Sequence, residues 1–255
     1  MEVETALPTM RERLRAFFKE RRHTAMLVAL VAAFAIRPLL GDSGDGPVAF
    51  SVALLVLLLV ALLTIQLDDE VSAHTTTATE RRIRSFIGWG LAIPAVVDRI
   101  FITFAPNNAL YLAGSICWFL LFAFITLNEL RTVVRHKDVS RETISLSISI
   151  YLLIGFTWGV FYIVLHHLQP GSFSLGGTPL PSGPAAESQS FPTLLYFSMT
   201  TLSTIGFGDI TPMTMQARYA AVAEGITGQF YLAILVARLV GLQMSQRADS
   251  KSSSG

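Results

Sequence analysis

The fold of this chain depends on the stretch Phe191-Pro-Thr-Leu-Leu-Tyr-Phe-Ser-Met-Thr-Thr-Leu-Ser-Thr-Ile-Gly-Phe-Gly-Asp-Ile-Thr-Pro212. Its apolar part, residues 192–203, is too short to cross a membrane, because a hydrocarbon core of about 30 Å needs about 20 residues of helix. Pro192 suits the first turn of a short helix, where its missing N–H would be unpaired in any case. The alternating Gly206 and Gly208 then allow backbone conformations closed to other residues. We interpret the stretch as a re-entrant helix ending near residue 203, followed by a non-helical strand, which is tolerated at membrane depth only inside protein or lining a pore.

The composition of the chain indicates a membrane protein. Of its 255 residues, 52% are apolar and only 15% are charged, and the mean hydropathy is +0.54. A soluble domain usually carries about 25% charged residues, so this chain has too few charges for a soluble globule and too much apolar surface for a disordered chain. The net charge of +1 argues against nucleic acid as a partner, and the single Cys117 excludes an intrachain disulfide.

Six segments are long and apolar enough, or nearly so, to cross a bilayer as helices. They are residues 25–40, 48–67, 86–105, 109–130, 144–168 and 215–242. Together with the re-entrant segment, they predict an all-α membrane protein with six transmembrane helices and a pore helix.

Lys and Arg residues occur in alternate loops. They are concentrated before residue 23, in the loops after the second and fourth spans, and in the tail, whereas residues 41–47, 106–108 and 169–191 contain none. Because basic loops stay in the cytoplasm, we expect a multi-pass protein of the plasma or inner membrane with both termini cytoplasmic.

The hexapeptide Thr204-Ile-Gly-Phe-Gly-Asp209 resembles the potassium-channel signature Thr-Val-Gly-Tyr-Gly-Asp. The resemblance covers residues 144–242 as outer helix, pore helix, selectivity filter and inner helix. It implies a homotetramer, because one chain carries one pore unit and four must surround the ion. It also implies that protein oxygens replace the hydration shell of K⁺. The ion-binding residues would be Thr204, with its carbonyl and hydroxyl, then Ile205, Gly206 and Phe207, with Gly208 completing the filter.

The resemblance also assigns residues that support the filter. Tyr196 and Phe197 occupy the place of the aromatic pair that packs behind the filter in the family. Thr200 stands where some bacterial members carry a Glu that pairs with the filter Asp, so Asp209 lacks that partner here. In the inner helix, Gly225 and Gly228 are candidate gating hinges, and close helix packing is the alternative role for both.

Glu224 is expected to support the filter from behind. It lies six residues after Arg218, about 9 Å inward of the outer interface at 1.5 Å per residue. A carboxyl group at that depth must be neutral or have a partner. We expect it to bond the pore helix or the filter, through Thr200, Thr201 or Ser203.

Two charges inside the membrane are predicted to form a pair. Arg37 in the first span and Asp98 in the third both lie roughly 18–20 Å from the cytoplasmic side, so a salt bridge within the four-helix domain is reasonable. Residues 109–130, the fourth span, contain no Lys or Arg. Since steep voltage gating needs several moving charges per subunit, we expect none here.

The sequence thus predicts four parts: a basic amphipathic cytoplasmic segment (1–23), a charge-poor peripheral domain resembling a voltage sensor (24–141), a pore domain (142–243) and a disordered tail (244–255). The predicted function is passive, K⁺-selective conduction without enzymatic activity, with K⁺ in the filter as the only bound metal, no other cofactor, and membrane lipids and further copies of the chain as partners. The alternatives left open are a weakly selective Na⁺/K⁺ channel, a subunit of a K⁺ uptake transporter and a silent regulatory subunit. Proton or metal sensing by His166 and His167 is also left open.

Overall fold

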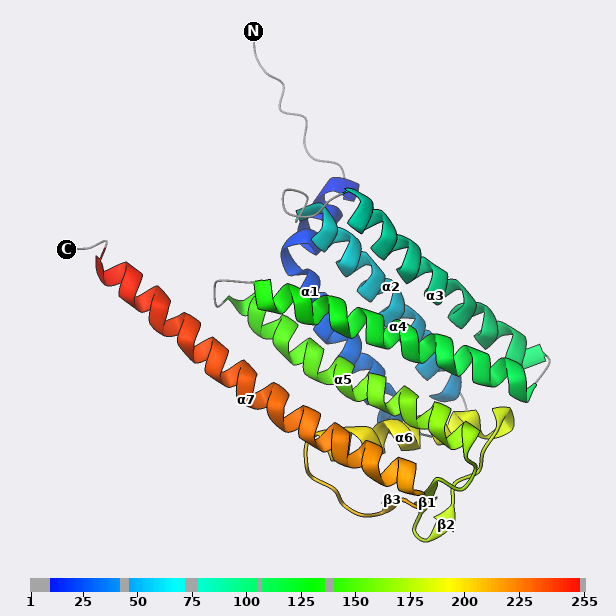
Figure 1. The fold of residues 1–255 in the computed structure, drawn as a ribbon. Coiled ribbons are helices and arrows are strands. Elements are labelled where there is room, and N and C mark those ends of the chain that lie inside the picture. Colours follow the sequence, from blue (N-terminus) through cyan, green and yellow to red (C-terminus); the bar gives the residue numbers. More distant parts are fainter. Residues whose placement is uncertain (1–9, 42–45, 72–77, 105–106, 136–139, 253–255) are drawn as a thin grey trace.

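The computed structural model describes residues 10–41, 46–71, 78–104, 107–135 and 140–252 of the chain (Figure 1). Nearly all of this is helix. The long helices are α1 (Met10–Leu40), α2 (Gly46–Val71), α3 (Ala78–Phe104), α4 (Asn108–Arg135), α5 (Arg141–Leu168) and α7 (Met215–Ser252), with the shorter α6 (Glu187–Leu202) between the last two.

Five of these helices contain a stretch long and apolar enough to cross a bilayer. The stretches are Arg21–Leu40, Val48–Gln66, Asn108–Arg135, Arg141–Leu168 and Met215–Met244. The prediction of an all-α membrane protein is therefore confirmed. Helix α3 has 27 residues, which is about 40 Å at 1.5 Å per residue, and Trp118 of α4 donates its indole N–H to the Ala95 carbonyl of α3 at 3.1 Å. That α3 also spans the membrane stays a prediction.

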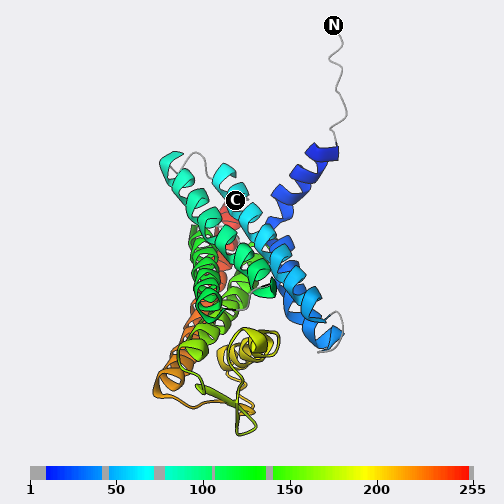
Figure 2. The ribbon, with the colours of Figure 1, turned by 90° about the vertical axis from the view of Figure 1, so that its right-hand side faces the viewer.

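Helix α5 lies at the centre of the arrangement. Helices α1 and α4 pack against one side of it, with α2 on α1 and α3 on α4, while α6 and α7 lie on the other side (Figures 1 and 2). Helix α7 is also tied to its neighbours by polar contacts. The Tyr231 hydroxyl donates to the Ser147 carbonyl of α5 at 2.7 Å, and Arg238 donates to the Val134 carbonyl of α4 at 2.9 Å. The four peripheral helices and the pore helices therefore form one connected unit.

A small antiparallel sheet pairs strands that precede and follow α6. Strand β1 (Phe173–Leu175) pairs with β2 (Thr178–Pro179) on one side and with β3 (Ile210–Pro212) on the other. This joins the loop before α6 to the segment after the filter. The sequence predicted only a loop here, because strands of two or three residues are too short to show an alternating pattern.

Two predicted boundaries need correction. Helix α6 begins at Glu187, after a 3₁₀ turn (Pro184–Ala186), so Pro192 lies inside the helix rather than in its first turn. Helix α7 continues to Ser252, whereas disorder was predicted from residue 244. The physical reason for the second difference is that residues 243–251 contain no Gly or Pro, the residues that usually end a helix.

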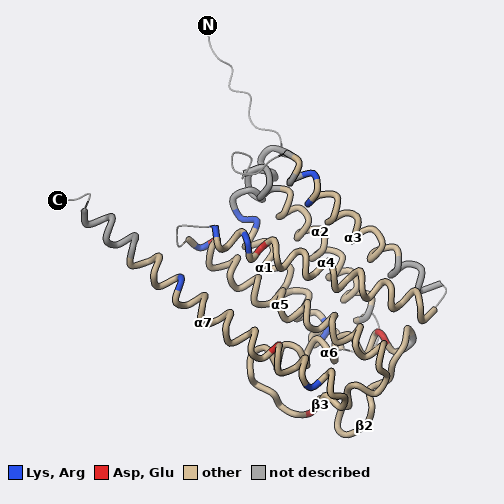
Figure 3. The backbone as a smooth tube through the Cα atoms, in the orientation of Figure 1, with Lys and Arg blue, Asp and Glu red and all other residues tan. Residues whose placement is uncertain are grey.

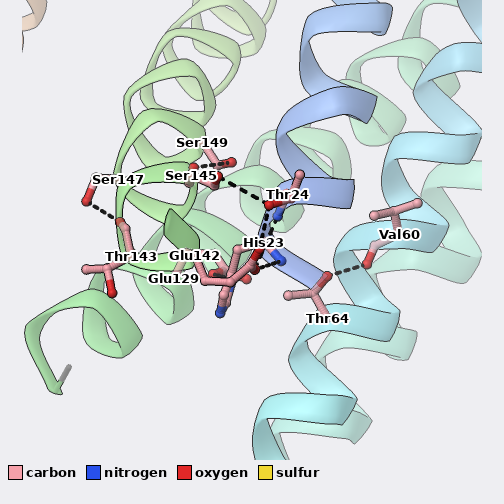
Figure 4. A network of polar contacts seen from close by, with 10 residues as sticks. All are labelled: His23, Thr24, Val60, Thr64, Glu129, Glu142, Thr143, Ser145, Ser147 and Ser149. Carbon is pink, nitrogen blue, oxygen red and sulfur yellow. Dashed lines mark hydrogen bonds and ion pairs between the residues drawn. The ribbon is translucent and has the colours of Figure 1, made fainter. Parts of the chain in front are cut away.

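Helix α1 is interrupted at Arg21, whose backbone angles of φ −121° and ψ 26° are not helical. The N–H groups that follow such a break begin a new helical piece and lack partners within it. Glu142, in the first turn of α5, accepts hydrogen bonds from the backbone N–H groups of His23 at 3.1 Å and Thr24 at 3.4 Å, and from the Thr24 hydroxyl (Figure 4). A carboxylate of one helix therefore caps another.

The same cluster brings α4 to this junction. Nδ1 of His23 lies 3.6 Å from a carboxylate oxygen of Glu129, and both side chains are buried. The Thr24 hydroxyl also lies 3.3 Å from that of Ser145. Helix α1 is thus bonded to both α4 and α5 (Figure 4).

Replacing Glu142 by Ala should lower the free energy of unfolding by about 2 kcal/mol, because three donors lose a charged acceptor. The measurement is the thermal unfolding midpoint in detergent. The control is Arg141→Gln, which changes the exposed residue just before Glu142 in the same turn and should leave the midpoint nearly unchanged. Equal midpoints for Glu142→Ala and the unmodified protein would contradict the capping role.

Candidate ion-conduction site

The segment after α6 has an alternating backbone conformation. Thr204, Gly206 and Gly208 have φ values of +59°, +54° and +79°, while Ile205 and Phe207 between them do not have positive φ. Glycine adopts the left-handed region without cost. Thr204 is β-branched, so its conformation costs on the order of 1–3 kcal/mol, which the surrounding contacts must supply.

The N–H groups of this strand turn back toward the last turn of α6. Those of Ile205 and Gly206 donate to the Thr200 carbonyl at 2.9 and 3.1 Å, and that of Thr204 donates to the Thr201 carbonyl at 3.0 Å. The described residues contain no cis peptide bond, and in a planar trans peptide the C=O points opposite to the N–H. The carbonyls of Thr204 and Ile205 therefore point away from α6.

The open side of the strand is exposed in the single chain, where residues 204–209 are all exposed. The polar groups of these exposed residues include the backbone oxygens and the Thr204 hydroxyl, which donates to the Ser203 carbonyl at 2.7 Å. Oxygens of these kinds can coordinate a cation. Within the part of the chain that the structure describes, no group of three His, Cys, Asp or Glu side chains is placed to hold a metal ion. The predicted ion-binding residues lie together in this one strand.

The comparison with protein families covers the same region. Residues 150–243 match the ion channel family. The chain is 28% identical over 145 residues to the voltage-gated potassium channel Kch of Escherichia coli, and 35% identical over 101 residues to two pore potassium channel c of rice (Oryza sativa subsp. japonica). It is also 27% identical over 128 residues to the protein LctB of Bacillus caldotenax.

Residues 150–243 thus match the ion channel family, and the chain is similar to known potassium channels. The three matches cover 57%, 39% and 50% of this chain, and 30%, 20% and 91% of the respective relatives. The chain therefore spans less than a third of the length of the two named potassium channels. No solved structure matches it.

The two aromatic residues assigned by resemblance to potassium channels point in different directions. The Tyr196 ring is stacked on Phe207 of the filter strand, with centroids 6.4 Å apart and planes at 2°. Phe197 contacts the rings of Tyr162 and Phe173 at 5.2 and 5.3 Å. Tyr196 therefore contacts the strand after α6, where its predicted role as filter support stays a prediction, and Phe197 packs α6 against α5 and β1.

Glu224 of α7 is fully buried against α6. Its carboxylate oxygens accept hydrogen bonds from the Tyr162 hydroxyl of α5, at 2.6 Å, and from the Ser198 hydroxyl of α6. The Ser198 oxygen also lies 2.7 Å from the Gly155 carbonyl of α5. This one carboxyl group therefore joins the outer, pore and inner helices.

These partners differ from the three that the sequence analysis named. The Thr200 hydroxyl donates to the Phe197 carbonyl and the Ser203 hydroxyl to the Met199 carbonyl, both within α6. No contact of Glu224 with Thr201 is recorded among the described residues. Ser198 is the pore-helix hydroxyl that faces Glu224, and neither it nor Tyr162 was identified from the sequence.

Glycines on both sides let α6 lie close to its neighbours. A Cβ added at Gly155 of α5 would lie 2.6 Å from the Met199 sulfur, and one added at Gly228 of α7 would lie 2.4 Å from the Leu202 carbonyl oxygen. Gly159 is similarly close to Leu195. The spacing Gly155-x-x-x-Gly159 is the small-residue pattern of packed membrane helices, and it was a signal in the sequence that went unused.

The two candidate hinge glycines differ in their surroundings. A Cβ at Gly225 would lie 3.8 Å from the Thr201 carbonyl oxygen, which is ordinary contact, whereas Gly228 has no room for one. Close packing therefore accounts for the glycine at 228. A hinge at either position stays a prediction.

Three of the remaining predicted residues, Arg37, His166 and His167, have contacts that the structure describes. Arg37 donates to the Ser188 carbonyl of α6 at 2.6 Å, while the side chain of Asp98 lies outside the described residues, so their predicted pairing stays untested. His166 is buried and lies 3.2 Å from the Pro181 carbonyl. The His167 ring packs against Tyr111 at 5.0 Å. These contacts join the pore part to the loop before α6 and to α4.

Replacing Glu224 by Leu should lower the free energy of unfolding by about 3 kcal/mol, because two buried hydroxyls lose their hydrogen-bond partner. The readout is thermal unfolding in detergent with K⁺ present. Ser149→Ala is the control, since that buried hydroxyl bonds a carbonyl of its own helix and its loss leaves no partner unpaired. A midpoint no lower than that of the control would contradict the bracing role.

Gly228→Ala should lower the free energy of unfolding by about 1–3 kcal/mol, the usual cost of overpacking. It should also reduce assembly of the chain. Gly225→Ala is the matched variant, one helical turn earlier, and should assemble normally. For both variants, size-exclusion chromatography measures assembly and thermal unfolding measures stability. If Gly225→Ala proves as disruptive as Gly228→Ala, contact with Leu202 is not what requires glycine.

Proposed function

We propose that the chain is the subunit of a K⁺-selective channel, with residues 204–208 as its selectivity filter. The observation that carries the proposal is the alternating backbone of this strand, whose first three N–H groups, those of residues 204–206, are bonded to α6. The carbonyls of Thr204 and Ile205 are then free to replace water around a dehydrated cation. The K⁺ channels among the relatives support the choice of ion.

We further propose that four copies surround the ion. One strand provides one wall of the site, and oxygens from several chains are needed to enclose a cation. The exposed face of α7 supports assembly, because it carries a row of large apolar residues three or four positions apart. They are Tyr219, Val222, Ile226, Phe230 and Ile234, each more than half exposed in the single chain.

The proposed orientation has both termini in the cytoplasm. Figure 3 places several of the described Lys and Arg residues at the end of the bundle where α4 finishes and α5 begins, away from the filter. Arg131, Arg135 and Arg141 lie there, in the last turns of α4 and the first turn of α5. This is the distribution that positive-inside topology favours.

The proposed channel is not steeply gated by voltage. Moving one elementary charge across 100 mV is worth about 2.3 kcal/mol, so steep gating needs several charges per subunit. Helix α4 carries no Lys or Arg before Arg131. Its acidic Glu129 is buried beside His23, so α4 is proposed to be a static packing helix.

The experiment is a bilayer recording of purified protein in bi-ionic K⁺/Na⁺ solutions, swept in voltage. We expect unitary currents that reverse near the K⁺ equilibrium potential, with a weak dependence of open probability on voltage. A reversal near zero would indicate a weakly selective channel. The absence of unitary currents would indicate a transporter or a silent subunit. An e-fold rise in open probability within less than about 10 mV would mean several moving charges.

Gly206→Ala tests the filter assignment. It should abolish K⁺ selectivity or conduction, because φ near +54° is unfavourable for a residue with a Cβ. Gly176→Ala is the matched control: its φ is +55°, and neither glycine has any atom within 4 Å of an added Cβ, but Gly176 lies in the β1–β2 turn. Wild-type selectivity in Gly206→Ala would exclude this strand as the filter.

A further inference from the structure

The pore helix has a gap in its own hydrogen bonding. In an α-helix, each carbonyl accepts from the N–H four residues later, and proline has no N–H. Pro192 lies inside α6, four residues after Ser188. The Ser188 carbonyl therefore has no donor at that position of its own helix.

A side chain from the peripheral helices bonds this carbonyl. Arg37, in the last turn of α1, donates from Nη2 to the Ser188 oxygen at 2.6 Å, across 151 positions of sequence. An arginine–carbonyl bond is charge-assisted and stronger than the neutral amide bond that it replaces. The contact therefore joins the peripheral domain to the pore helix at the turn where Pro192 removes a backbone hydrogen bond.

The position of this contact relates it to the filter. Arg37, Pro192, Tyr196 and Asp209 line one cavity of about 400 Å³. Tyr196 follows Pro192 by one helical turn and stacks on Phe207, and Thr200, one turn further, holds the amides of Ile205 and Gly206. A shift at the beginning of α6 would therefore move the groups that hold the filter strand.

The piece of α1 that follows the break at Arg21 is also fixed to the pore part at its beginning. Glu142 of α5 caps the helical piece that begins after Arg21. Helix α1 thus connects the first turn of α5 to the first turns of α6. At each end, a side chain of one part satisfies backbone groups that are left unpaired in the other.

We propose that Arg37 is a positioning residue for the pore helix, and through it for the selectivity filter, by replacing the hydrogen bond that Pro192 removes. The proposal rests on the function proposed above for residues 204–208. It gives the peripheral domain a role that does not require it to move. A role of Arg37 that depends on charge alone, such as a pair with Asp98 or with lipid headgroups, would not involve Pro192.

The test is a double-mutant cycle between Arg37 and Pro192. Arg37→Met removes the donor but keeps the length of the side chain, and Pro192→Ala supplies the missing N–H. We expect Arg37→Met to lower open probability by about tenfold, as for the loss of one charged hydrogen bond. In the Pro192→Ala background, the same change should cost less than about twofold. Arg37→Lys, which keeps a donor, should fall between the two.

Arg218→Met is the control for the loss of a positive charge at the outer end. Because Arg218 donates to the Pro212 carbonyl, at 3.2 Å, the effect of this substitution should add to that of Pro192→Ala. Additive effects of Arg37→Met and Pro192→Ala would overturn the proposal, as would wild-type behaviour of Arg37→Met. The same cycle is measured on thermal unfolding midpoints, which do not depend on conduction. If the unmodified protein conducts no K⁺ while the midpoints are coupled, the filter assignment fails and the Arg37 contact stands.

Discussion

Backbone N–H groups cannot remain unpaired at membrane depth, where each costs several kcal/mol, and this constraint governs the re-entrant segment. The last carbonyls of any helix lack partners within that helix. The strand after α6 uses them: the carbonyls of Thr200 and Thr201 accept the N–H groups of Thr204, Ile205 and Gly206. The end of the helix and the beginning of the strand therefore satisfy each other. In the proposed channel, the strand's carbonyls can face a cation only while this arrangement holds, so the proposed site depends on the position of α6.

The surroundings of α6 hold it on several sides. Gly155 and Gly228 allow α5 and α7 to approach its backbone, and Glu224 bonds both Tyr162 and Ser198. The outer end is held by the sheet, in which β3 places the chain after the filter beside β1. These contacts are local to the pore part. They explain why the segment can be rigid within one chain, whereas enclosure of an ion needs further copies.

Some of this was visible in the sequence and some was not. The glycine spacing predicted the non-helical strand after α6, and the apolar segments predicted the all-α class, because both depend on local chemistry. The depth of Glu224 indicated that it has a partner. Which hydroxyl faces it depends on the rotation of α6 about its axis. The Thr200 and Ser203 hydroxyls instead donate to carbonyls of α6 itself. Pro192 suggested a helix start because prolines are common there. Its position inside the helix depends on the preceding residues and on Arg37, which is distant in sequence.

The same physical rule explains three charges that lie between helices, of which Arg37 belongs to the peripheral part and Glu142 and Arg238 to the pore part. Arg37 bonds a carbonyl of α6, Glu142 bonds N–H groups of α1, and Arg238 of α7 bonds the Val134 carbonyl in the last turn of α4. Each of these charges is held by backbone groups that a helix break, a proline or a helix end leaves without a regular partner. A charge used in this way cannot cross the membrane field without exposing those groups, and each exposed group would oppose the movement. These contacts therefore favour a peripheral domain that braces the pore rather than one that senses voltage.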